Sequence, residues 1–125
     1  MKSRFSLLLL FLTSFTSGAL NKSDQRWIDA VSVTYGERAG KRVSTWRSNM
    51  TSYAGLSEKE KLDSVNRFFN QMYFVDDSIL WGKNDYWATP LEFLGSNAGD
   101  CEDFTIAKYF SLLELGVPDK KLRLV

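Results

Sequence analysis

The chain has 125 residues, 16 basic and 15 acidic side chains, a formal charge of +1, and 44% hydrophobic residues. This composition is typical of one small globular domain and excludes wholesale disorder. No basic patch is evident, which argues against a nucleic-acid partner.

The first 19 residues are organised like a secretory signal peptide. Residues 1–4 form a short basic start, residues 5–15 are an apolar run, and residues 17–19 are small. The run is shorter than the roughly 20 apolar residues that span a bilayer, so a cleaved signal peptide is favoured over a retained membrane anchor. We therefore expect export to the periplasm and a mature domain of residues 20–125, which carries 14 basic and 15 acidic residues.

Two helices are expected first in the mature chain. Helical spacing of apolar residues begins after Asn21, with Ser23 or Asp24 as the capping residue, and it weakens near Gly36. A second helix is predicted over residues 41–53.

The next helix has the clearest start signal in the sequence. Ser57 followed by Glu60 fits a capping box, in which each side chain binds the other residue's backbone N–H. An apolar stripe follows at helical spacing and predicts packing against another helix. Its members are Leu62, Val65, Phe69 and Met72.

The remaining elements are shorter. Residues 74–81 are ambiguous between a helix end and an extended piece, and residues 81–87 have the composition of a loop. Thr89 and Pro90 predict the cap and first residue of a short helix. A helix is expected from Cys101 to about residue 115, and residues 121–125 alternate like the start of a strand with no good partner strand upstream.

The chemically distinctive stretch is residues 99–104, with the sequence GDCEDF. Asp100 is a good N-cap, which places Cys101 at the first helical position, where the helix dipole favours a thiolate. Glu102 and Asp103 add two more carboxylates, and these disfavour a neighbouring negative charge. A divalent cation with oxygen ligands, such as calcium, would relieve that conflict.

Cys101 is the only cysteine, so it cannot form an internal disulfide. In an oxidising compartment it is a reactive thiol, an intermolecular link or an inert buried residue. Its polar, flexible neighbours count against burial. The aromatic residues Trp81, Tyr86, Trp87 and Phe93 are expected to pack the loop onto the core, with a substrate cleft as the alternative.

Four segments together resemble the bacterial transglutaminase-like cysteine proteinases of the LapG type. They are residues 85–92 (DYWATPLE), 99–104 (GDCEDF), 107–110 (AKYF) and 115–119 (LGVPD). The resemblance extends from about Trp27 to the end of the chain and is specific from Trp81 onward.

The resemblance implies an α+β, papain-like or transglutaminase-like fold, here mainly its helical N-terminal part with the start of the sheet. It implies a periplasmic, calcium-dependent cysteine protease that cleaves a large surface adhesin, controls biofilm release and is sequestered by the periplasmic domain of a membrane cyclic di-GMP receptor. By position, Cys101 matches the nucleophile. Asp100, Glu102 and Asp103 match the acidic residues around it, and the first two are favoured as calcium ligands.

One departure from the family is serious, because the chain contains no histidine. A cysteine protease needs a base to form the thiolate and to protonate the leaving amine. The sequence therefore predicts an incomplete, inactive protease domain. Two alternatives remain, a catalytically inactive relative that binds calcium or the receptor, and a small helical periplasmic protein whose acids merely cap a helix.

Overall fold

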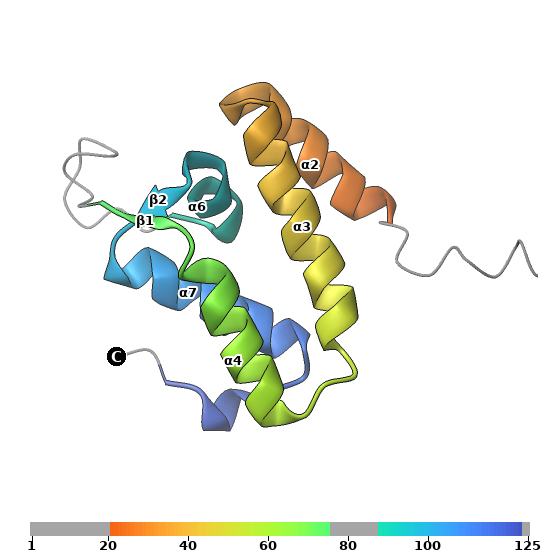
Figure 1. Cartoon of the computed structure of the whole chain (residues 1–125), viewed down its shortest axis with the longest axis vertical. Helices are drawn as coiled ribbons and strands as arrows, with labels where there is room; N and C mark the ends of the chain where they lie inside the picture. Colours follow the sequence, from red (N-terminus) through yellow and green to blue (C-terminus); the bar gives the residue numbers. More distant parts are fainter. Residues whose placement is uncertain (1–20, 76–87, 124–125) are drawn as a thin grey trace, which may run out of the picture.

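The computed structural model describes residues 21–75 and 88–123, which fold into helices around one core with a two-stranded sheet at its edge (Figure 1). The elements in chain order are α2 (Lys22–Tyr35), α3 (Glu37–Tyr53), α4 (Glu58–Phe69), β1 (Tyr73–Phe74), α6 (Pro90–Ser96), β2 (Ala98–Gly99), α7 (Cys101–Glu114) and the 3₁₀ helix η3 (Asp119–Lys121). This mostly helical α+β arrangement confirms the expected fold class. The proposed signal peptide and residues 76–87, including the ambiguous segment beyond Val75 and the expected loop, lie outside the described residues.

Helices α2 and α3 form a hairpin that reverses at Gly36, where φ is 103° (Figure 1). The expected caps were wrong, because the Asn21 side chain accepts the backbone N–H of Asp24. Helix α3 also begins four residues earlier than predicted. Gly40 lies inside α3. A Cβ at this position would lie 1.8 Å from Ser32 Oγ, so glycine allows α2 and α3 to approach closely.

Helix α4 begins with the predicted capping box of Ser57 and Glu60. Its stripe is buried at Val65, Phe69 and Met72, whereas Leu62 is 38% exposed. The stripe therefore faces the core, as predicted, except at its first residue.

Aromatic rings connect the helices at the centre of the core. Phe69 of α4 stacks on Phe93 of α6 with ring centroids 6.0 Å apart, and Phe93 meets Phe104 of α7 edge to face at 4.7 Å. Trp46 of α3 donates from Nε1 to the buried Ser111 Oγ of α7 at 3.0 Å. Phe93 is fully buried, so packing, rather than a substrate cleft, is its role; the other three aromatic residues considered with it lie outside the described ranges.

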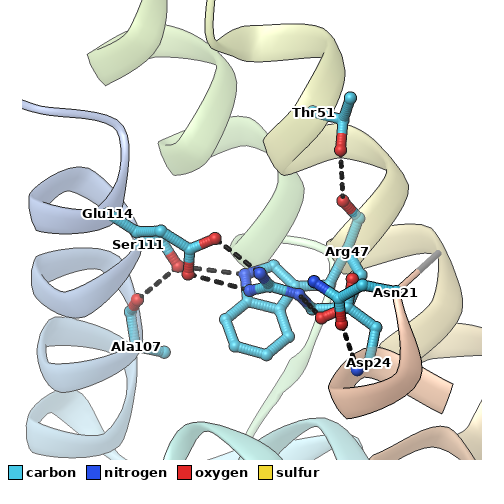
Figure 2. A network of polar contacts seen from close by, with 8 residues as sticks. Asn21, Asp24, Arg47, Thr51, Ala107, Ser111 and Glu114 are labelled. Atoms are coloured by element: carbon cyan, nitrogen blue, oxygen red, sulfur yellow. Dashed lines mark hydrogen bonds and ion pairs between the residues drawn. The ribbon is translucent and has the colours of Figure 1, made fainter. Parts of the chain in front are cut away.

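A network around Arg47 joins the start of α2 to the far end of α7 (Figure 2). Its guanidinium binds Asp24 at 2.9 Å and both carboxylate oxygens of Glu114, and it lies over the rings of Trp27 and Trp46. Burial lowers the pKa of Arg47, but the hydrogen bonds and charges of Glu114 and Asp24 outweigh that effect and raise it overall. The network therefore holds α7 against the first helical hairpin.

Strands β1 and β2 are parallel, with Tyr73 opposite Ala98 and Phe74 opposite Gly99. The sequence left residues from 74 onward open between a helix end and an extended piece and predicted no strand at residues 98–99, because each strand has only two residues. This pairing places the segment that follows α4 beside Ala98 and Gly99, just before the cap of the cysteine helix.

The predicted strand start at residues 121–125 was wrong where the structure describes it. Lys121 ends the 3₁₀ helix η3, because Pro118 begins a turn whose carbonyl accepts the Lys121 N–H. Leu122 is extended but not part of a strand. Within residues 21–75 and 88–123, no helix is long and apolar enough to cross a membrane.

Candidate active site at the start of α7

Cys101 is the first residue of α7, its thiol is unpaired, and it is exposed. The helix begins there because Asp100 is extended and its side chain accepts the Asp103 N–H, as predicted. The Cys101 carbonyl accepts the Thr105 hydroxyl at 2.7 Å. The thiol therefore lies at the positive end of a 14-residue helix and open to a reaction partner.

Asp103 faces inward and is fully buried. Its Oδ1 accepts the Ala88 N–H at 2.9 Å, and its Oδ2 accepts the Asp100 N–H at 3.1 Å. Burial raises the pKa of the Asp103 carboxyl and the nearby Asp100 carboxyl adds to this, although the two backbone N–H groups act in the opposite direction. One side chain thus connects the segment before α6 to the residue before Cys101.

Gly99 is the residue that permits this arrangement. A Cβ at this position would lie 2.7 Å from Asp103 Cβ and 2.9 Å from both Asp103 Oδ2 and Phe93 Cδ1. Only glycine leaves room for the buried carboxylate beneath the strand. The Gly-Asp-Cys-Glu-Asp order therefore follows from packing as well as from chemistry.

Helix α6 places Ala88 where Asp103 can reach it. Thr89 is the cap and Pro90 the first helical residue, as the sequence predicted, and Glu92 completes a capping box with Thr89. Arg42 of α3 holds the other end of α6 by donating to the carbonyls of Leu94 at 2.7 Å and Gly95 at 2.9 Å. No local sequence pattern indicates the hydrogen bonds of Arg42 or of the Ala88 N–H, because their partners lie more than a dozen residues away in the sequence.

The three carboxylates predicted for calcium do not converge. Asp103 uses both oxygens on backbone N–H groups inside the protein, while Glu102 is exposed on the helix surface. Within the described ranges, no group of three or more His, Cys, Asp or Glu side chains is arranged to hold a metal ion. Carboxylates from Asp100 and Glu102 have the hard oxygen chemistry that calcium prefers, so these two fit such an ion better than Asp103 does.

Comparison with known proteins gave one family match. The family model of the bacterial transglutaminase-like cysteine proteinases matches residues 34–125, which include all the site residues above. No curated protein sequence matches the chain significantly.

Among solved structures, calcium-bound LapG of Legionella pneumophila is 39% identical, covers 74% of this chain and 51% of its own, and has a TM-score of 0.63. A second structure of LapG from the same organism is 36% identical, covers 78% of this chain and 53% of its own, and has a TM-score of 0.65. An EGTA-treated form is also 36% identical, covers 78% and 52%, and has a TM-score of 0.65. The chain thus spans about half the length of the solved proteins that it matches.

Proposed function

The chain belongs to the bacterial transglutaminase-like cysteine proteinases, and from this we propose that it supplies the nucleophile-bearing part of a calcium-dependent periplasmic cysteine protease. One observation carries the proposal: the lone cysteine is exposed at the first residue of α7, within the segment matched by the family. The similarity of the chain to LapG supports the same assignment.

Cys101 is the proposed nucleophile. Its sulfur attacks the scissile carbonyl carbon, and its own backbone N–H at the start of α7 would help to stabilise the resulting oxyanion. The thiol proton and the leaving amine need a base and an acid, and an imidazole normally serves as both. The 125 residues contain no histidine, and lysine titrates too high to replace it, so we expect no turnover by this chain alone.

Calcium is the proposed cofactor, because one matching LapG structure is calcium-bound and another is EGTA-treated. Asp100 and Glu102 flank Cys101 in the sequence and would provide carboxylate ligands. When bound, the ion would offset the negative charge of these acids beside a thiolate. Asp103 would hold the loop in shape from inside without binding the ion.

The proposed substrate is a large surface adhesin whose cleavage releases biofilm cells, and the proposed inhibitor is the periplasmic domain of a membrane cyclic di-GMP receptor. Both follow from the family resemblance, and the signal-like residues 1–19 agree with a periplasmic location. The absence of histidine favours a second candidate function, a catalytically inactive relative that binds calcium or the receptor.

Cleavage of an adhesin N-terminal fragment tests the proposal. The 125-residue chain and any longer, histidine-containing product of the same reading frame are incubated with the fragment in calcium or in EGTA. We expect calcium-dependent cleavage by the longer product, its loss in Cys101→Ala, and none by the 125-residue chain. A longer product that binds calcium but leaves the fragment intact would favour the inactive relative.

Calorimetric titration tests the ligand assignment separately. Asp100→Asn keeps the N-cap acceptor and Glu102→Gln keeps the side-chain shape, so each removes charge while preserving the helix start. Both variants should bind calcium more weakly than wild type, whereas Asp29→Asn on the exposed face of α2 should bind it equally. Unchanged affinity in both site variants would place the ion elsewhere.

A further inference from the structure

A groove runs between α3 and α4. Two hollows of about 390 and 340 Å³ share Thr45, Phe68 and Gln71, and together they form what we call the α3–α4 groove. Helices α3 and α4 stand side by side in Figure 1 and form its walls. The buried Phe68 lines both hollows.

The groove is lined by side chains that both donate and accept hydrogen bonds. Thr45 and Asn49 lie one helical turn apart on α3, and Ser64 and Gln71 face them from α4 and the turn after it. Amides and hydroxyls of this kind pair with the N–H and C=O groups of a peptide backbone.

The charges along the groove are positive. Lys41 and Arg42 line one hollow and Arg67 lines the other, and among the described residues no acidic side chain lines either. In the part of the chain that the structure describes, neither Lys41 nor Arg67 makes an ion pair. Asp63 lines an adjoining hollow and is paired with Lys59 at 3.3 Å.

The surroundings of Arg42 are consistent with an excess of positive charge in the groove. The Arg42 guanidinium donates to two backbone carbonyls, and within the described ranges it makes no ion pair with a carboxylate. Burial lowers the pKa of Arg42, and repulsion from Arg38 lowers it further. An anionic ligand in the groove would therefore meet positive charge that no ion pair among residues 21–75 and 88–123 neutralises.

The shape of the groove favours an extended chain. From Lys41 to Asn49 the wall rises about 12 Å at 1.5 Å per residue, which matches about four residues of extended peptide. The cations are distributed along this length, whereas a single phosphate group needs donors that converge on one point. The groove is also concave, whereas a protein surface that lies on a membrane is flat.

We propose that the α3–α4 groove binds an extended, acidic segment of a partner protein. Side chains of Asp or Glu in the segment pair with Lys41 and Arg67, while its backbone bonds to the amides and hydroxyls between them. The site uses no residue of the candidate active site, so binding is independent of Cys101.

Fluorescence anisotropy with two labelled peptides tests this proposal on the 125-residue chain at low salt. One peptide alternates Glu and Ser over eight residues, and the other has Gln in place of each Glu. We expect the acidic peptide to bind at least tenfold more tightly than the Gln peptide, and addition of salt to weaken it.

Four variants, each checked for native circular dichroism, locate the site. Lys41→Glu combined with Arg67→Glu should weaken the acidic peptide at least tenfold, and Thr45→Tyr should weaken it by filling the groove without changing charge. The matched control, Lys22→Glu combined with Lys120→Glu, reverses two exposed cations elsewhere and should change affinity less than twofold. Cys101→Ala should bind like wild type.

Equal affinity of the acidic peptide for wild type and for the Lys41/Arg67 variant would overturn the proposal. It would also be overturned if the Lys22/Lys120 control lost as much affinity as the Lys41/Arg67 variant. Retained affinity in Thr45→Tyr would show that surface charge, and not the groove, attracts the peptide. Displacement of the peptide by an unstructured oligonucleotide at lower concentration would overturn it in favour of a nucleic-acid ligand.

Discussion

Replacement of Asp103 by alanine should destabilise the protein more than any other single carboxylate deletion at the start of α7. The buried carboxylate accepts two backbone N–H groups, from Ala88 at 2.9 Å and from Asp100 at 3.1 Å. Alanine provides no acceptor for either. Ala88 is itself only 2% exposed, so water does not readily replace the lost bond.

The expected magnitude follows from these two bonds. The buried Ala88 N–H left without a partner costs about 1–3 kcal/mol. Loss of the capping-box bond to the Asp100 N–H adds to this cost. Burial of the carboxylate offsets part of the cost, because it already raises the pKa of Asp103. We expect the free energy of unfolding to fall by about 2–4 kcal/mol, a large share of the 5–15 kcal/mol typical of a domain.

Urea unfolding followed by tryptophan fluorescence measures this change. Asp103→Asn keeps one acceptor but turns an NH₂ group toward the other donor, so its loss should be intermediate. Asp29→Ala, on the exposed face of α2, is the control and should change stability by less than about 0.5 kcal/mol. A loss below about 0.5 kcal/mol in Asp103→Ala would refute the claim that its carboxylate holds the two segments together.

Three further outcomes are expected. Gly99→Ala should lower stability by about 1–3 kcal/mol in thermal melts, because its Cβ would lie 2.7 Å from Asp103 Cβ; a melt like that of wild type would contradict the packing argument. Ser57→Ala should cost about 1 kcal/mol in urea unfolding, since it removes the acceptor in the capping box with Glu60, and an unchanged midpoint would count against that cap. Intact-mass analysis of a periplasmic extract should find a chain that begins at Leu20, whereas a chain that retains Met1 would contradict signal cleavage.

Much of the local structure could be predicted because it depends on neighbours in the sequence. The capping boxes that start α4 and α6 each join residues three apart, and the same is true of Asp100 at the start of α7. Side chains that bind backbone so close by leave a readable pattern. The exposed position of Cys101 followed from the same helix-start signal.

Long-range contacts were not predictable in this way. The parallel pair of β1 and β2 joins two-residue strands separated by the whole of α6, too short for alternation to be visible. Asn21 was missed as a cap because Ser23 and Asp24 are equally good candidates nearby. The direction in which Asp103 points depends on Ala88, 15 residues earlier, and no spacing rule indicates it.

The three acids around Cys101 therefore divide into two roles. Asp103 is committed to backbone N–H groups and stabilises the loop from inside, which accounts for one carboxylate without any ion. Asp100 caps the helix through its interaction with the Asp103 N–H, and a neutral Asn can do the same. The capping geometry thus requires acceptors but not the full negative charge that Asp100 and Glu102 bring to the thiol. That excess charge is a cost to a reactive thiolate unless a cation offsets it. The calcium titrations of Asp100→Asn and Glu102→Gln therefore test the charge of these two residues and leave their hydrogen bonding in place.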